Sequence, residues 1–201
     1  EECEKVFEEV LSAGKDLLHI GFSSALSVNY NMTAGILEEM KQKYPDRKIY
    51  TVDSLTGSLG EGALVLAAAE KRESGEEIEA VHAFAEQAKT KICSLFTVEN
   101  LAYLYRGGRL KKTAFLIAST LNIKPIIHAD NEGKLVPIGK VFGRKMSLSN
   151  LAQRIAAEMT DPENGTLYIA HGDCIEDVEF LISKIKEKIP VKNIVINYID
   201  L

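Results

Sequence analysis

A run of hydroxyl side chains directly after a short apolar segment is the part of the sequence best suited to bind an anion. Residues 17–22 have the length and apolar character of a buried strand, and Ser23 and Ser24 follow them. Either serine would cap a helix that starts here, where free backbone N–H groups and the positive end of the helix dipole favour a carboxylate or a phosphate. Serines also cap helices that bind no ligand, and this stretch alone does not separate the two interpretations.

A second hydroxyl-rich junction follows the next predicted strand, at residues 49–53. Residues 54–62 contain three hydroxyl side chains and three glycines. A helix between the two strands implies a parallel crossover, which places both junctions at the same edge of the sheet. The glycine spacing is G-x-x-G-x-G and not the dinucleotide fingerprint, and the sequence contains neither a Walker-type phosphate loop nor a G-x-S-x-G nucleophile elbow.

Residues for other kinds of chemistry are few. The four histidines form no H-E-x-x-H pair and the three cysteines form no Cys-x-x-Cys pair, so the sequence predicts no metal site and no catalytic residue. Widely spaced thiols suit a reducing cytoplasm. A net charge of −5 provides no basic field for nucleic acid, and no apolar run is long enough for stable membrane insertion.

One segment of this acidic chain is strongly basic. Residues 106–112 hold four cationic side chains around a pair of glycines. One interpretation is a solvated turn between helices. The other is a contact for an anionic group or an acidic partner surface, with Arg106 and Arg109 as the candidates, because arginine forks bind carboxylates and phosphates well.

The elements that must position these residues follow from hydrophobic periodicity. In the first half, helical spacing predicts helices over residues 1–15, 24–44 and 76–90. Residues 63–69 predict an apolar helix that we expect to be buried on several sides. Together with the two strands, these elements predict a parallel, Rossmann-like α/β sheet.

The second half predicts a different kind of sheet. We expect strands over residues 93–98, 123–128, 134–141, 167–171 and 193–199, and helices over residues 113–121, 147–159 and 174–189. Residues 130–133 form a turn signal between two of these strands, which indicates antiparallel pairing. We therefore expect an α/β domain over residues 1–92 and an α+β domain with an antiparallel sheet over residues 93–201.

Six segments of the chain together resemble a known family. They look like successive motifs of the DegV family, and they occur in the family's order at residues 21–30, 52–62, 103–110, 121–128, 130–135 and 171–173. The resemblance implies a bacterial protein of two domains that holds the chain of a long-chain fatty acid between them, so that residues 93–201 cover the acyl chain. It also implies that the carrier presents the fatty-acid carboxylate to a separate fatty acid kinase for phospholipid synthesis, as a kinase B-subunit does.

The resemblance also implies roles for particular residues. Ser24, with Ser23 as the alternative, is expected to bind the carboxylate, and Arg106 and Arg109 resemble a basic surface loop that contacts the partner. The chain would be a non-catalytic cytoplasmic carrier without a cofactor, its ligand being the fatty acid. Motifs that the family has before and after this segment do not occur here, so we expect a piece of a longer protein.

Two other functions remain compatible with the residues. The first is an enzyme that binds a phosphate ligand with the two serine- and glycine-rich junctions, although the usual phosphate loop and catalytic pairs are missing. The second is an interaction module that docks a partner through the basic loop and binds no ligand.

Overall fold

The computed structural model describes residues 2–111 and 122–199. The chain forms two compact units, which are Glu1–Ile92 with Asn131–Gly133, and Cys93–Asp130 with Lys134–Leu201. The helix predicted over residues 113–121 lies outside the described residues.

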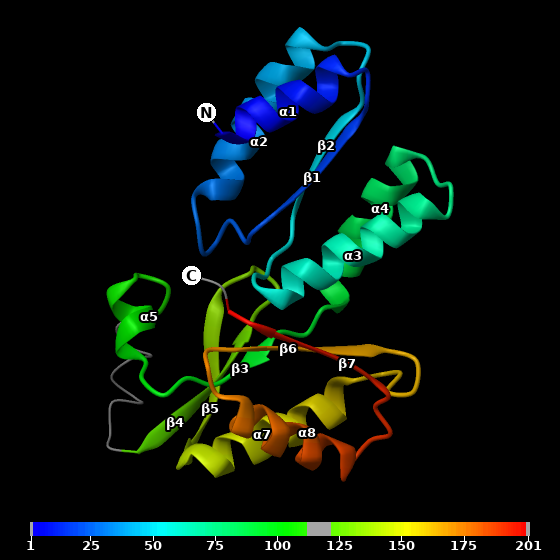
Figure 1. Cartoon of the computed structure of the whole chain (residues 1–201). Coiled ribbons are helices and arrows are strands. Elements are labelled where there is room, and N and C mark those ends of the chain that lie inside the picture. The colour runs from blue at the N-terminus through cyan, green and yellow to red at the C-terminus, as the bar shows by residue number, and fades with distance from the viewer. Residues whose placement is uncertain (1, 112–121, 200–201) are drawn as a thin grey trace. The chain divides into compact units, whose positions relative to one another are not determined.

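The first unit is built around a pair of parallel strands. Its elements are α1 (Glu2–Ser12), β1 (Leu17–Gly21), α2 (Asn29–Lys43), β2 (Ile49–Asp53), α3 (Leu59–Glu73) and α4 (Ile78–Ala88), as Figure 1 shows, with a short 3-10 helix at Lys89–Lys91. β1 pairs with β2 in parallel, with Leu17 opposite Ile49 and Gly21 opposite Asp53. The predicted parallel α/β arrangement is confirmed.

Side chains of this strand pair alternate between two hydrophobic clusters, as the period of a strand requires. On one side, Leu17 and Ile49 pack with α1 and α2. On the other side, Leu18 and Val52 pack with α3 and α4. The sheet is therefore covered by helices on both faces, and its strand ends remain available for polar side chains.

Helix α3 differs from its prediction. Only Leu64 and Ala68 are buried on it, whereas Val65 and Leu66 are 43% and 52% exposed. The expected burial on several sides is wrong for the described structure, because α3 packs through one stripe of residues against the sheet and α4. Val65 and Leu66 therefore keep about half of their surface exposed in the described structure.

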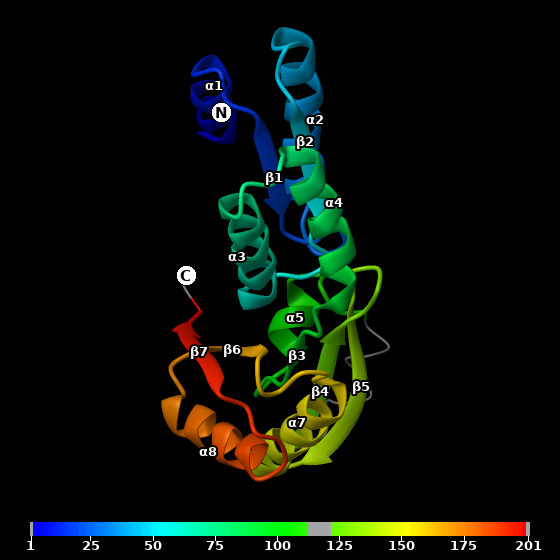
Figure 2. The ribbon, with the colours of Figure 1, turned by 90° about the vertical axis from the view of Figure 1, so that its right-hand side faces the viewer.

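The second unit combines an antiparallel sheet with a parallel strand pair. Its elements are β3 (Leu95–Phe96), α5 (Ala102–Arg106), β4 (Ile123–Ala129), β5 (Leu135–Phe142), α7 (Arg144–Glu158), β6 (Thr166–His171), α8 (Ile175–Lys186) and β7 (Asn193–Tyr198). The antiparallel sheet has the order β3-β4-β5, in which the predicted antiparallel pairing of β4 with β5 is confirmed, and β6 pairs with β7 in parallel around α8. Figure 2 shows α7 lying along the β4–β5 hairpin.

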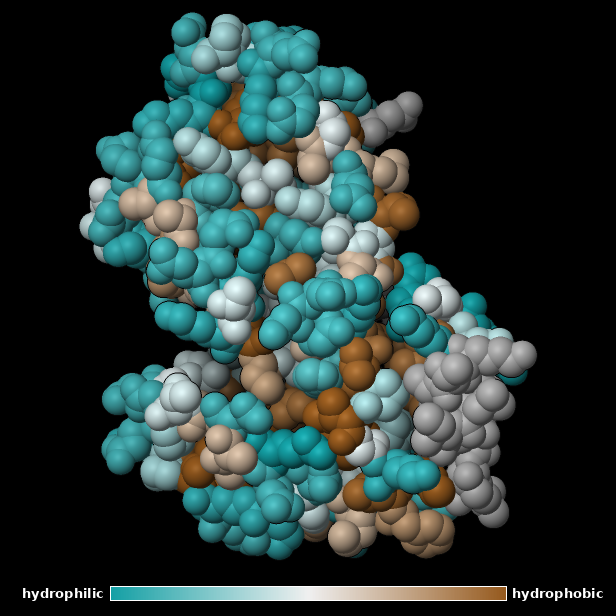
Figure 3. Space-filling model, turned by 180° about the vertical axis from the view of Figure 1, so that it is seen from behind, coloured by the Kyte–Doolittle hydropathy of each residue, from teal (hydrophilic) through white to brown (hydrophobic). Residues whose placement is uncertain are grey.

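The core of this unit lies between its helices and its sheets. Ile126 of β4, Leu151 of α7 and Ile185 of α8 belong to one buried cluster. Most of the molecular surface in Figure 3 is hydrophilic, with apolar patches. No helix within the described residues is long and apolar enough to cross a membrane.

Candidate functional site

The predicted serine cap of α2 is not formed. α2 begins at Asn29, five residues after Ser24, because a separate turn follows β1 first. The carbonyl of Ser23 accepts hydrogen bonds from the N–H groups of Leu26 and Ser27, at 3.0 and 3.1 Å. The Ser27 hydroxyl then accepts a hydrogen bond from the Asn29 N–H at 3.2 Å. The two candidate serines therefore belong to a turn between strand and helix, and the prediction that either caps the helix is wrong.

This serine turn and the junction after β2 lie side by side. The Ser23 N–H donates to the Thr56 carbonyl at 2.8 Å, and the Ser54 N–H donates to the Gly21 carbonyl at 3.0 Å. Parallel strands that end at one edge of a sheet bring their junctions together in this way, as the sequence predicts.

Asp53 joins the two junctions. Its Oδ1 accepts hydrogen bonds from the Ser24 N–H at 3.2 Å and from the Leu55 N–H at 3.1 Å. The second bond closes an Asx turn, and Leu55 adopts a φ of 56°, in the left-handed region. Next to this turn, the Phe22 ring packs so closely on Gly57 that an added Cβ would lie 2.1 Å from a ring carbon. The backbone around the serines is thus held by specific contacts on both sides.

The two candidate serines differ in what their hydroxyls do. Ser23 is fully buried, and its hydroxyl donates to the Gly133 carbonyl at 3.0 Å and accepts from the Ala25 N–H at 3.3 Å. A hydroxyl has a single hydrogen to donate, so the donor capacity of Ser23 is used. Ser24 is half-buried, and its hydroxyl has no hydrogen-bond partner among the described residues.

The backbone N–H groups of the serine turn are also used. Every backbone N–H from residue 23 to residue 27 donates to an acceptor within the first unit. A phosphate cradle requires several free N–H groups, and the Asp53 carboxylate between the junctions would repel a dianion. The serine turn therefore disfavours the phosphate-binding alternative, while the Ser24 hydroxyl keeps a hydrogen that it can donate.

Two titratable groups of the first unit are perturbed by burial. Burial lowers the pKa of His19 on β1, whose Nδ1 lies 3.1 Å from the Thr51 hydroxyl oxygen and whose ring stacks on Tyr30. Burial raises the pKa of Glu61 in the first turn of α3. Both shifts favour the neutral form. In the described part of the chain, no three acidic, histidine or cysteine side chains are grouped to hold a metal ion.

The candidate arginines lie in the second unit, where Arg106 is the last residue of α5 and Arg109 follows in the turn after it. Gly107 ends that helix, and Gly108 adopts a φ of 75° as the chain turns. Arg109 donates through Nη1 to the Gly107 carbonyl, and Arg106 and Arg109 are both exposed, while Leu110 is buried and anchors the loop. The loop is thus exposed, and its arginines belong to a different unit from the two serines.

Comparison with known proteins identifies the family. A family model described as "Uncharacterised protein, DegV family" matches residues 1–201. The chain belongs to the DegV family. A DegV domain-containing protein of Clostridium perfringens is 42% identical over 197 residues, which are 98% of this chain and 68% of that protein. The chain therefore spans about two thirds of the length of this relative.

Solved DegV structures share the fold. A DegV family protein of Ruminococcus gnavus with vaccenic acid matches with a TM-score of 0.87 and 27% identity, over 98% of this chain and 70% of that one. The Streptococcus pneumoniae Fatty Acid Kinase B3 protein loaded with linoleic acid matches with a TM-score of 0.79 and 23% identity, over 92% and 65%. This second match shows the common fold alone. The predicted family and fold class are both confirmed.

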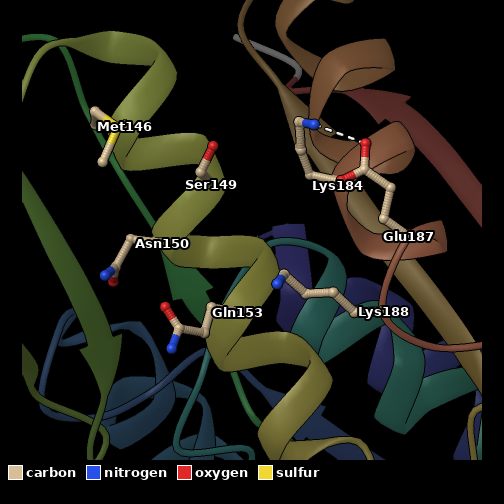
Figure 4. A pocket seen from close by; sticks show the side chains of 7 residues that line it. All are labelled: Met146, Ser149, Asn150, Gln153, Lys184, Glu187 and Lys188. Carbon is tan, nitrogen blue, oxygen red and sulfur yellow. Dashed lines mark hydrogen bonds and ion pairs between the residues drawn. The ribbon is translucent and has the colours of Figure 1, made fainter.

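A hollow of about 310 Å³ lies between α7 and α8 of this DegV chain (Figure 4). Six of the seven residues that line it are polar or charged, and the Lys184 ammonium forms an ion pair with Glu187 at 2.6 Å. An acyl chain needs an apolar lining, so this hollow does not suit one.

Sequence analysis of this DegV chain did not find two residues of the site. Asp53 stands at the end of a predicted strand, next to a polar junction, and this position is the only feature of the sequence that indicates a role in the site. Gly133 lies 110 residues from Ser23, and its role as hydrogen-bond acceptor has no signal in a single sequence. Its turn was predicted, but the place where the turn packs was not.

Proposed function

We propose that this protein binds a long-chain fatty acid and holds the carboxylate with the Ser24 hydroxyl. The observation that carries the proposal is the contrast between the neighbouring serines, since the Ser23 hydroxyl is buried and occupied while that of Ser24 is half-buried and has no partner within the described residues. A hydroxyl at this position donates to a carboxylate without needing to displace an internal bond. The DegV relative with vaccenic acid supports a fatty acid as the ligand.

The acyl chain supplies most of the binding energy in this proposal. Each buried CH₂ contributes about 0.8 kcal/mol, so a long chain needs an extended apolar surface. The exposed Val65 and Leu66 of α3 offer such a surface in the first unit. We assign the head-group junction to residues 1–92 and the cover of the acyl chain to residues 93–201.

The protein in this proposal is a carrier and not an enzyme. It presents the carboxylate to a fatty acid kinase in the cytoplasm, and the kinase performs the chemistry. Arg106 and Arg109 are exposed on a loop that fits an acidic partner surface. The role of these arginines rests on the resemblance of the loop motif and on their exposure.

Ligand identity is tested by mass spectrometry of an organic extract from the natively purified, full-length protein that contains this chain. We expect a stoichiometric long-chain fatty acid. An extract without fatty acid, together with no uptake of added oleic acid, would contradict the proposal.

The head-group assignment is tested by measuring oleic acid affinity for Ser24→Ala. We expect affinity to fall about tenfold, the value of one hydrogen bond to a charged group, with the free energy of unfolding unchanged within about 0.5 kcal/mol. Ser27→Ala is the matched control, because it removes another hydroxyl from the same turn and should leave affinity unchanged. Equal affinity of Ser24→Ala and the unaltered protein would remove Ser24 from the site.

A further inference from the structure

The turn between β4 and β5 reaches the serine junction. The strands belong to the second unit, whereas Asn131–Gly133 belongs to the first. The turn is closed by two hydrogen bonds between Asp130 and Lys134, in which the Asp130 N–H donates to the Lys134 carbonyl and the Lys134 N–H donates to Asp130 Oδ1, both at 2.9 Å. The Gly133 carbonyl is thereby held in place as the acceptor of the Ser23 hydroxyl, at 3.0 Å.

Gly133 fits its place only because it lacks a side chain. Its φ is 74°, and an added Cβ would lie 2.2 Å from the Ser23 hydroxyl oxygen and 3.0 Å from the Leu55 Cα. The first contact would push the serine hydroxyl away, and the second is with backbone that has little freedom to move. Any larger residue at this position must displace Ser23, Leu55 or the turn itself.

These contacts surround the backbone of Ser24 and connect Ser23, Asp53, Leu55, Thr56 and Gly133. Gly133 holds the Ser23 hydroxyl, and Thr56 holds the Ser23 N–H. Asp53 holds the Ser24 N–H together with the Leu55 N–H, and Leu55 in turn lies against Gly133. The backbone of Ser24 is therefore fixed on both sides, while its hydroxyl hydrogen remains available for a ligand.

We infer that Gly133 is a positioning residue for the fatty-acid carboxylate, and that it acts through Ser23 on the neighbouring Ser24. This inference rests on the proposed function. Binding is stronger when a donor is already held in the bound geometry, because less freedom is lost when the ligand arrives. In this arrangement Ser23 is a support for the donor, and the turn at Asn131–Gly133 belongs to the head-group site.

The test compares Gly133→Ala with Gly14→Ala in the full-length protein. Both glycines have a φ of 74°, and an added Cβ at Gly14 would meet no atom within 4 Å. The two variants therefore carry the same backbone strain, and only Gly133→Ala disturbs Ser23. We expect oleic acid affinity to fall about tenfold for Gly133→Ala and to stay unchanged for Gly14→Ala.

Oleyl alcohol separates positioning from general loss of structure. It has the same chain as oleic acid but no carboxylate, so its affinity should be nearly the same in Gly133→Ala and the unaltered protein. An equal loss for the acid and the alcohol, or no loss for either, would overturn the inference.

The double variant Ser23→Ala with Gly133→Ala tests the route of the effect. Ser23→Ala removes the oxygen that the new methyl group would meet, so the two losses of acid affinity should combine to less than their sum. Full additivity would show that Gly133 does not act through Ser23. If the unaltered protein binds no fatty acid, the proposed function fails; if it binds but Gly133→Ala behaves like Gly14→Ala, only this inference fails.

Discussion

The described residues contain two strand–helix–strand crossovers with the same plan and with different side chains at their strand ends. β1, α2 and β2 form the first, and β6, α8 and β7 form the second; in each, the two strands pair in parallel without a register shift. In open α/β sheets, ligands bind at the ends of such strands. The backbone topology of either crossover is therefore suited to a ligand site at the strand ends.

The two crossovers differ in the side chains that lie at their strand ends. In the second crossover, Nδ1 of the buried His171 accepts a hydrogen bond from the Cys174 N–H at 3.2 Å, and its ring packs on Tyr198 with 4.4 Å between ring centroids. Arg144 binds Asp177 in the first turn of α8 at 2.7 Å. A histidine, a tyrosine and an ion pair therefore lie at this end.

The first crossover ends in small hydroxyl side chains instead. The hydroxyl of Ser23 donates to the Gly133 carbonyl, whereas the hydroxyl of Ser24 has no hydrogen-bond partner among the described residues. The two crossovers share a topology and differ in the side chains at their strand ends, and function depends on such side chains more than on the fold.

The largest expected effects test whether the two units, each of which contains one of the crossovers, unfold independently. Leu64 of α3 and Ile185 of α8 are each fully buried in separate clusters. Leu64→Ala and Ile185→Ala should each lower the free energy of unfolding by about 2–5 kcal/mol, through lost burial and a cavity. Hydrogen exchange measured by mass spectrometry should show the loss of protection only in the unit that carries the substitution. Equal loss in both units would mean that they unfold as one.

A smaller effect compares the acidic residue of each crossover. Asp53→Ala leaves two backbone N–H groups without an acceptor and should lower the free energy of unfolding by about 1–3 kcal/mol. Asp177→Ala breaks a partly exposed ion pair with Arg144 and should cost less than about 1 kcal/mol. Urea denaturation measures both values. The reverse order of the two losses would contradict the description of Asp53 as the residue that joins the junctions.

A pH effect should distinguish the first unit from the second. Burial lowers the pKa of His19 in the folded state, so the folded protein binds this proton less readily than the unfolded chain. The contribution of His19 to stability is therefore present above the unfolded value near 6.5 and is lost as the pH falls through the lower folded value. His19→Gln removes the titration. We expect it to reduce the loss of first-unit stability in acid, measured by hydrogen exchange at pH 5 and 7.5; an unchanged pH dependence would count against this assignment.

The smallest effect on stability concerns the basic loop. Arg106→Glu with Arg109→Glu should change the free energy of unfolding by no more than about 0.5 kcal/mol, because both side chains are exposed. Under the proposed function, oleic acid affinity should be unchanged, whereas phosphorylation of the bound fatty acid by a fatty acid kinase should become slower. Lys5→Glu with Lys15→Glu is the control, since it makes the same change in net charge at exposed sites of the first unit. A loss of oleic acid affinity in the arginine variant would place the arginines in the ligand site.

Periodicity was enough to predict the strands and most helices, because each buries one regular face. It did not predict the start of α2, since Ser23 and Ser27 use their polar groups to close local turns before Asn29. It also overestimated the burial of α3, because an apolar residue such as Leu66 has the same pattern whether or not another element covers it.

The proximity of the two junctions followed from strand order, but the distinction between the two serines did not. Ser23 and Ser24 are identical in type and adjacent in sequence. Their difference depends on Gly133, which only the folded chain brings to Ser23. A contact between residues so far apart is set by tertiary packing and leaves no local pattern.

The separation of 110 residues between Ser23 and Gly133 also sets an order of events during synthesis. The ribosome adds about 5–20 residues per second, so the serine is made roughly 5–20 s before its acceptor. Over that interval the nascent first unit has its strands and its serines but not the turn that supports them. The serine junction, where we propose that the carboxylate binds, is consequently among the last parts of the first unit to mature, and a chain arrested before residue 133 would leave the ribosome without the Ser23–Gly133 hydrogen bond.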